Sequence, residues 1–413
     1  MRFRKPSSSE VHAESSHPGV ESRVSRDRFE DIRTSGTLVS PTRVWIISIL
    51  VFLALSMLPL RGNAEEKMAF WKTQKMGINA PSQPPKEEWW KAAKEVGAQF
   101  VRLAPDAWSG DGRDFLLGSA NEYRGLIMED LTVLRRQLDL AQAQGLKVVL
   151  VMRSLPGCRR PLGKQELSDR RLWQEHRFWA QAATFWRELA RGCAGHPALV
   201  GYDVLHEPHP SRILLHTHVA DAVMKLSWDT KIWGSLGDIN HLYKVLAASI
   251  RQVDPETPII LESDLFAAPG AFAIVVPLPD PKILYSFHFH EPREFTSGAL
   301  NRGRFAYPAK MPAADGKGCI NWDRRTFRQR LKPVIKWSQV HEIPAVRILV
   351  GEFGCDRESI GSGEFLADAV VVFNALGYHW ACSSDRADDK KILDAKAWKD
   401  AFSDPHKPAR GPR

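Results

Sequence analysis

The stretches LVGYDVLHEP (199–208), ILYSFHFHEP (283–292) and RILVGEFGC (347–355) decide the fold. Each is a nearly continuous apolar run that ends in polar residues, which is typical of strands buried on both faces of a parallel sheet. Five further runs have the same character: MGINA (76–80), QFVRLAP (99–105), KVVLVMRS (147–154), PIILESD (258–264) and YHWACSS (378–384). The sequence therefore predicts eight strands.

Helical patterns separate these strands. Leu131, Leu134, Leu138 and Ala141 recur at helical spacing, as do Trp179, Ala182, Trp186 and Leu189. Eight strands alternating with helices predict an α/β fold consisting of a single (β/α)₈ TIM barrel, and no Pro/Gly/Ser-rich linker divides it. We place this domain at residues 65–405, followed by a flexible tail over 406–413.

The most apolar run, VWIISILVFLALSMLPL (44–60), lies near the N-terminus and is at the lower length limit of a membrane span. Two interpretations remain open for residues 44–64. They form either a secretory signal peptide cleaved near Gly62 and Ala64, or an uncleaved membrane anchor. Both predict an exported catalytic domain, whether periplasmic, secreted or held at the membrane facing outward. Residues 1–43 lack apolar periodicity, so we expect them to be disordered.

The composition excludes some partners. The net charge is +9, but the basic residues are spread among many acidic ones, so we expect no nucleic-acid binding. No HExxH motif supports a metal site, and we expect neither a metal nor a cofactor. We expect a monomer. Five cysteines leave at least one unpaired, and Cys355 and Cys382, which end adjacent predicted strands, are candidates for a disulfide.

Charged side chains follow several predicted strands at their carboxyl ends, where the active sites of (β/α)₈ barrels lie. Glu207 ends the fourth run and Glu352 ends the seventh. Arg102 ends the second strand and His288 lies at the end of the sixth. Two carboxylates on opposite sides of a scissile bond are what glycoside hydrolysis needs, one as an acid and one as a nucleophile.

The segments VRLAP (101–105), GYDVLHEP (201–208), YSFHFHEPREFT (285–296) and VGEFG (350–354) resemble glycoside hydrolase family 5, the cellulase family. The resemblance covers about residues 70–400. It implies a retaining mechanism with Glu207 as general acid/base and Glu352 as nucleophile. It also implies that Arg102 keeps the nucleophile ionised, that His288 lines the site, and that the substrate is a polysaccharide or oligosaccharide.

Four positions depart from the family pattern. His206 replaces the asparagine that holds the sugar 2-hydroxyl, and His290 replaces a tyrosine that hydrogen-bonds the nucleophile. Arg153 stands where a histidine is expected. Ser383 replaces the tryptophan under the sugar, which leaves Trp380 as the remaining candidate. We expect His206, His290, Arg153 and Trp380 to bind substrate.

Further tryptophans lie in segments that follow the second and fourth strands, where they either stack on sugars or anchor the loops. These are Trp108, which we include among the substrate-binding residues, Trp228 and Trp233.

The sequence favours an exported retaining hydrolase of β-linked polysaccharide, such as a cellulose-like glucan or an exopolysaccharide. A transglycosylase and a catalytically silent carbohydrate-binding barrel remain alternatives. The basic departures also suggest an acidic substrate, unless Arg153 is neutralised by an acid such as Asp203 or Glu262.

Overall fold

The computed structural model describes residues 67–108, 113–159, 169–215, 232–313 and 316–383, which belong to one compact unit, Leu60–Arg413. Eight parallel strands close into a barrel in the order β1-β10-β9-β6-β5-β4-β3-β2. They are β1 (Met76–Asn79), β2 (Phe100–Leu103), β3 (Lys147–Val151), β4 (Leu199–Asp203), β5 (Ile259–Glu262), β6 (Ile283–Phe289), β9 (Ile348–Phe353) and β10 (His379–Cys382). Each lies within one of the eight predicted runs, so the predicted (β/α)₈ barrel is confirmed.

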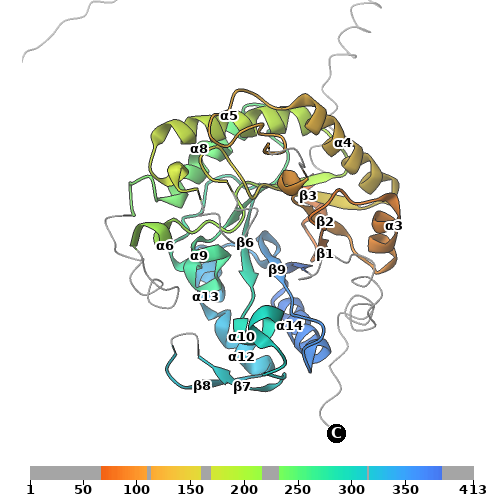
Figure 1. The fold of residues 1–413 in the computed structure, drawn as a ribbon, viewed down its shortest axis with the longest axis vertical. Coiled ribbons are helices and arrows are strands. Elements are labelled where there is room, and N and C mark those ends of the chain that lie inside the picture. Colours follow the sequence, from red (N-terminus) through yellow and green to blue (C-terminus); the bar gives the residue numbers. More distant parts are fainter. Residues whose placement is uncertain (1–66, 109–112, 160–168, 216–231, 314–315, 384–413) are drawn as a thin grey trace, which may run out of the picture. The chain divides into compact units, whose positions relative to one another are not determined.

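Helices surround the barrel (Figure 1). They are α3 (Glu87–Glu95), α4 (Met128–Ala143), α5 (His176–Cys193), α6 (Pro210–Leu215), α8 (Ile239–Arg251), α9 (Asp264–Ala267), α10 (Arg293–Thr296), α11 (Gly298–Asn301), α12 (Arg324–Arg330), α13 (Lys332–Val340) and α14 (Ser362–Leu376), with 3₁₀ turns at η1 (Pro105–Ala107), η2 (Arg171–Trp173), η4 (Pro269–Ile274) and η5 (Ala345–Arg347). The predicted apolar faces of α4 and α5 are buried. These faces pack the helices against the strands.

The interior of the barrel is layered. Successive residues of a strand face opposite sides, so positions two apart share the interior. Phe100, Ile260 and Leu284 belong to an apolar layer inside the barrel. Two residues further along the same strands stand Arg102, Glu262 and Ser286, all buried and polar. The interior therefore changes from apolar to charged toward the carboxyl ends of the strands.

Trp71 belongs to the apolar inner layer although it precedes the first strand. It is completely buried, and its indole N–H donates to the carbonyl of Val200 at 2.9 Å. Its ring meets Phe100 edge-on at a centroid distance of 5.3 Å, and His379 at 4.8 Å. The segment before β1 thus fills the amino-terminal end of the barrel.

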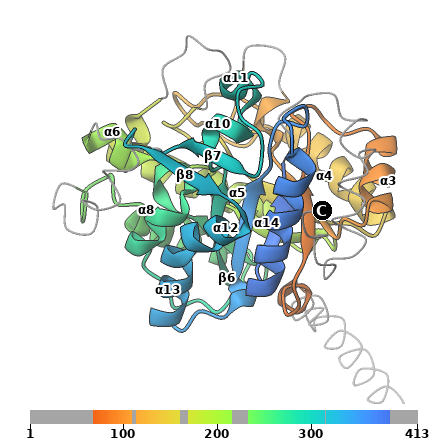
Figure 2. The ribbon, with the colours of Figure 1, turned by 90° about the horizontal axis from the view of Figure 1, so that it is seen from below.

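The chain between β6 and β9 contains a hairpin that the sequence analysis did not predict. Strands β7 (Ala309–Pro312) and β8 (Cys319–Trp322) pair antiparallel, apart from the barrel sheet. Figure 2 shows the hairpin beside α10 and α12. Met311 of β7 and Trp322 of β8 have buried side chains, which join the hairpin to the core that surrounds the barrel.

Several predictions for the chain termini concern residues outside those described: the disordered segment 1–43, the signal or anchor segment 44–64 and the tail 406–413. Among the described residues, no helix is long and apolar enough to cross a membrane. None of the five cysteines, all within the described residues, forms a disulfide. The Cys355–Cys382 disulfide is therefore absent, although both side chains are buried near the ends of adjacent strands.

We predict that Trp71→Ala lowers the free energy of unfolding by about 3–5 kcal/mol, the usual loss for truncating a large buried aromatic side chain. The indole contributes both its volume and the hydrogen bond to Val200. Urea denaturation monitored by circular dichroism measures the change. Trp233→Ala is the matched control, because Trp233 is 41% exposed. Equal losses of unfolding free energy in the two variants would show that Trp71 does not stabilise the barrel by filling its amino-terminal end.

Candidate active site

The predicted nucleophile and the predicted acid/base stand on different kinds of backbone. Glu352 lies within β9, one residue before the strand ends. Glu207 lies four residues after the end of β4, so it occupies a loop rather than ending the strand as predicted. Its φ of 50° is in the left-handed region, which is uncommon for a residue with a Cβ. Its N–H donates to Glu262 Oε2 at 2.6 Å, and this bond holds the loop.

Arg102 connects the strands beneath the site. Its Nη2 donates to Asp203 and Glu262, each at 2.7 Å. Its Nη1 donates to Glu352 Oε1 at 3.2 Å and to the carbonyl of Gly351 at 2.8 Å. Burial works to lower the pKa of Arg102, but the charges of Asp203, Glu262 and Glu352 outweigh it and raise the pKa. The guanidinium therefore stays charged although it is 1% exposed.

Glu352 has three positively polarised neighbours. Its Oε1 is bonded to His206 Nε2 at 2.8 Å as well as to Arg102, and its Oε2 lies 3.5 Å from His290 Nε2. Burial alone would raise the pKa of Glu352, but His288 and His206 outweigh it and hold the pKa well below its usual range. An ionised carboxylate is the form that a nucleophile needs.

His288 bridges two carboxylates. Its Nδ1 lies 3.0 Å from Glu207 Oε1, and its Nε2 lies 3.0 Å from Glu262 Oε1. Burial favours the neutral ring, but the charges of Glu262 and Glu352 raise the pKa of His288 to about 10. For Glu207, burial raises the pKa, whereas His206 and His288 lower it by a larger amount. In the free protein the proton of this pair therefore resides on His288.

The separation of the two glutamates distinguishes the stereochemical outcomes of glycoside hydrolysis. One oxygen of Glu207 and one of Glu352 lie within 4.8 Å of each other. Retaining enzymes hold their carboxyl groups about 5–5.5 Å apart, whereas inverting enzymes leave about 6.5–9.5 Å for a water molecule. The short separation matches retention.

Three residues of the site were missed as site residues by the sequence analysis. Asn79 Oδ1 accepts a hydrogen bond from Arg102 Nη1 at 3.0 Å. Asp203 and Glu262 accept hydrogen bonds from Arg102 Nη2. Burial and the charge of Glu262 raise the pKa of Asp203 to about 7, against the effect of Arg102. All three residues end observed strands: Asn79 ends β1, Asp203 ends β4 and Glu262 ends β5. The predicted runs extended further, to Ala80, Pro208 and Asp264, so the rule that selected Glu352 would have found these residues only with the correct strand ends.

Two substrate-binding predictions change in the structure. Trp380 is completely buried, and its indole N–H donates to Asn374 of α14 at 2.9 Å. It packs outside the barrel and offers no face to a sugar, so its prediction as a substrate platform is wrong. Arg153 pairs with Asp106 at 3.0 Å, and not with Asp203 or Glu262 as proposed. Its charge is therefore neutralised within the protein.

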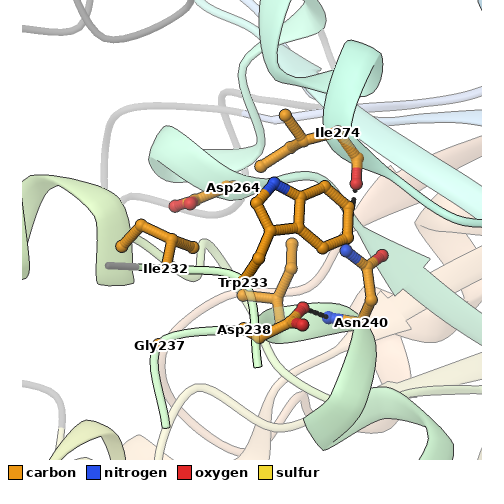
Figure 3. Close-up of a pocket in the computed structure, with 8 residues that line it drawn as sticks. Ile232, Trp233, Gly237, Asp238, Asn240, Asp264 and Ile274 are labelled. Atoms are coloured by element: carbon orange, nitrogen blue, oxygen red, sulfur yellow. Dashed lines mark hydrogen bonds between the residues drawn. The ribbon is translucent and has the colours of Figure 1, made fainter. Parts of the chain in front are cut away.

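The tryptophans in the loops have different settings. Trp108 follows η1 and is half-buried, with its ring edge-on to Phe115 at 5.3 Å. Trp233 lies across a shallow hollow beside Asp264 and Asn240 (Figure 3). The hollow has room for no more than about one water molecule, far less than the roughly 300–1,000 Å³ usual for ligand pockets, so we assign it no ligand of its own. Trp228 lies outside the described residues.

Comparison with known proteins agrees with this geometry. The family profile described as Cellulase (glycosyl hydrolase family 5) matches residues 64–381. No curated protein matches the sequence significantly. The profile spans most of the chain and includes every residue of the site described above. The chain therefore belongs to glycosyl hydrolase family 5, a family of retaining O-glycosyl hydrolases.

Solved structures share the fold at low sequence identity. The Pseudomonas stutzeri endoglucanase Cel5A is 18% identical with a TM-score of 0.55, covering 79% of this chain and 94% of that one. Thermotoga maritima Cel5A, in complex with mannotriose, is 15% identical with a TM-score of 0.56, covering 80% of this chain and 98% of that one. Subunit Z of the Clostridioides difficile cellulose synthase is 16% identical with a TM-score of 0.56, covering 81% and 100%.

We predict that Arg102→Met lowers the free energy of unfolding by about 3–5 kcal/mol, because it leaves Asp203 and Glu262 buried without their cation. Urea denaturation at neutral pH measures the change. Arg124→Met, which removes an exposed arginine paired with Glu122, should leave the transition midpoint unchanged. A loss of less than about 1 kcal/mol in Arg102→Met would mean that the buried carboxylates do not depend on Arg102.

Proposed function

We propose that the protein is an exported retaining glycoside hydrolase that cleaves a β-linked polysaccharide, with a cellulose-like glucan as the first candidate and an exopolysaccharide as the second. The observation that carries the proposal is the placement of two carboxylates within 4.8 Å of each other, each with its own hydrogen-bond partners. Glu352 is held ionised by its neighbours, and Glu207 lies beside a proton on His288.

In the first step, Glu352 attacks the anomeric carbon while the bond to the leaving oxygen breaks. The leaving oxygen takes its proton from Glu207. That proton comes from His288, because Glu207 Oε1 and His288 Nδ1 are 3.0 Å apart and share one proton between them. The products are a glycosyl ester on Glu352 and a shortened chain.

In the second step, Glu207 takes a proton from water, and the water oxygen displaces Glu352 from the anomeric carbon. If a sugar hydroxyl takes the place of water, the same site acts as a transglycosylase. Product analysis with an added acceptor sugar distinguishes the two. The catalytically silent alternative is disfavoured, because both carboxylates keep the hydrogen-bond partners that their roles require.

Two features support a neutral β-glucan as the substrate. The structural neighbours include an endoglucanase and a cellulose synthase subunit. In addition, Arg153 is neutralised by Asp106, which removes the main reason for preferring an acidic polysaccharide. His206 and His290 remain as basic groups beside Glu352, so we retain both as substrate-binding residues together with Trp108. Export and a monomeric state remain parts of the proposal that rest on the sequence.

We predict that Glu352→Gln lowers kcat/KM on a β-glucan by at least about 1,000-fold, because the amide does not form the glycosyl ester. Glu207→Gln should lower it by about 100- to 10,000-fold through the loss of proton transfer. A fluorinated glycosyl inactivator should label Glu352 in the wild-type protein, as detected by peptide mass spectrometry. The exposed Glu129→Gln should behave as wild type. Substantial activity in either active-site variant would refute the assignment.

We predict that His206→Asn moves the acidic limb of the pH profile of kcat/KM to higher pH. His206 is one of the groups that lower the pKa of Glu352, so its loss raises that pKa and protonates the nucleophile at a higher pH. His341→Asn, at an exposed position after α13, should leave the limb in place. If the acidic limb of the His206→Asn variant is unchanged, the hydrogen bond with His206 does not control the pKa of Glu352.

A further inference from the structure

Two histidines and two glutamates meet at the centre of the active site. One donor atom from each of His206, Glu207, His288 and Glu352 lies within 4.8 Å of the other three. Two imidazole nitrogens with two carboxylate oxygens form a donor set that suits zinc and related transition metals. The carboxylate pair belongs to the proposed hydrolytic reaction, but the combination with two imidazoles is a separate property of this chain.

We propose that the substrate-free site binds one divalent transition-metal ion of the zinc class through His206, Glu207, His288 and Glu352, and that the bound ion excludes the sugar. Hard cations such as Mg²⁺ prefer oxygen ligands alone, so they are not expected to compete for this site.

The distances within the cluster are close to those that a metal ion needs. His206 Nε2 lies 2.8 Å from Glu352 Oε1, and His288 Nδ1 lies 3.0 Å from Glu207 Oε1. In a tetrahedral zinc site with bonds of about 2.0–2.1 Å, neighbouring donor atoms are roughly 3.3 Å apart. On metal binding, the donor atoms of His206 and Glu352, and likewise those of His288 and Glu207, must therefore separate slightly. The distances between the first pair of residues and the second must become shorter. The side chains of Glu207 and Glu352 are 25% and 21% exposed, which leaves them room to turn.

The charges around the cluster favour a cation. Arg102, the permanent cation beside the cluster, pairs with Asp203, Glu262 and Glu352, and Glu207 adds a fourth carboxylate to the cluster. Arg102 Nη2 is engaged by Asp203 and Glu262. Within the described part of the chain, the ion pairs of Glu207 are all with histidines. A metal ion would replace the hydrogen atoms that now join each imidazole to its carboxylate.

An outer carboxylate already orients one of the histidines. Metal-ligating histidines usually direct their second ring nitrogen to a carboxylate or a carbonyl, which fixes the ring and makes it a better ligand. His288 comes near this arrangement: its Nε2 lies 3.0 Å from Glu262 Oε1, an ion-pair contact rather than an aligned hydrogen bond, while its Nδ1 faces the cluster. Glu262 is itself held by Arg102 and by the N–H of Glu207.

The test titrates ZnCl₂ into the chelator-treated full chain by isothermal calorimetry. We expect one ion per chain. His206→Asn and Glu352→Gln should each weaken binding by at least about 10-fold, whereas the exposed His341→Asn should bind zinc like the wild type. MgCl₂ should produce no binding heat. With a β-glucan substrate, zinc should raise KM without lowering kcat, and EDTA should reverse the effect.

The absence of zinc binding would overturn the proposal, and so would unchanged affinity in both His206→Asn and Glu352→Gln, because the ion would then bind elsewhere. Circular dichroism of both variants confirms that weaker binding does not come from misfolding. Calorimetry needs no turnover, so the metal site is tested even if the proposed hydrolysis fails. Conversely, a protein that cleaves glucan but binds no zinc would refute this inference alone.

Discussion

The ion pairs of Arg102 are the interaction on which the rest of the site depends. One guanidinium from β2 contacts Asp203 of β4, Glu262 of β5 and Glu352 of β9, so it links three other strands of the barrel. An isolated buried charge is unstable, and Arg102, Asp203 and Glu262 are all buried. Their mutual pairing is what allows a charged layer to lie on top of the apolar interior of the barrel.

This charged layer also sets the protonation of the catalytic groups. Glu262 neither attacks nor donates in the proposed reaction, yet it contacts the N–H of Glu207, the ring of His288 and the guanidinium of Arg102. It therefore positions the acid/base and helps to keep a proton on His288. The two proposed catalytic glutamates differ because Glu352 faces Arg102 and His206, whereas Glu207 faces a histidine that shares its proton with it.

The sequence predicted the strands because their cores are apolar and short, and it predicted Arg102, His288 and Glu352 because these residues lie within or at the ends of those strands. The error at Trp380 comes from strand alternation. Ala381 occupies the inner layer of the barrel, so its neighbour Trp380 must point outward. The hairpin β7–β8 was missed because Ala309–Pro312 and Cys319–Trp322 are only four residues long each and lack the continuous apolar run of the barrel strands; β8 packs against α12. The ion-pair partner of Arg153 was not predicted either, because Asp106 belongs to the turn η1. The spacing of residues in the sequence does not define where such a turn lies.

The backbone around Glu207, the proposed acid/base, is unusual in a way that suits this role. Glu207 has a left-handed φ, and so do Leu265, Phe266 and Ala267 in the turn that follows β5. Such conformations are unfavourable for residues with a Cβ and persist only where neighbours hold them. Here the N–H of Phe266 donates to Pro208 at 3.0 Å, and the Phe266 ring stacks on His209 at 4.2 Å.

His209 in turn lies 2.9 Å from the carbonyl of Glu207, so the two strained turns support each other. The nucleophile needs no such support, because a β-strand already fixes Glu352. The acid/base must give up a proton to one oxygen and later take one from another, and a loop placed by side-chain contacts allows small adjustments that a strand does not. The division between a strand-borne nucleophile and a loop-borne acid/base therefore follows from the chemistry assigned to each.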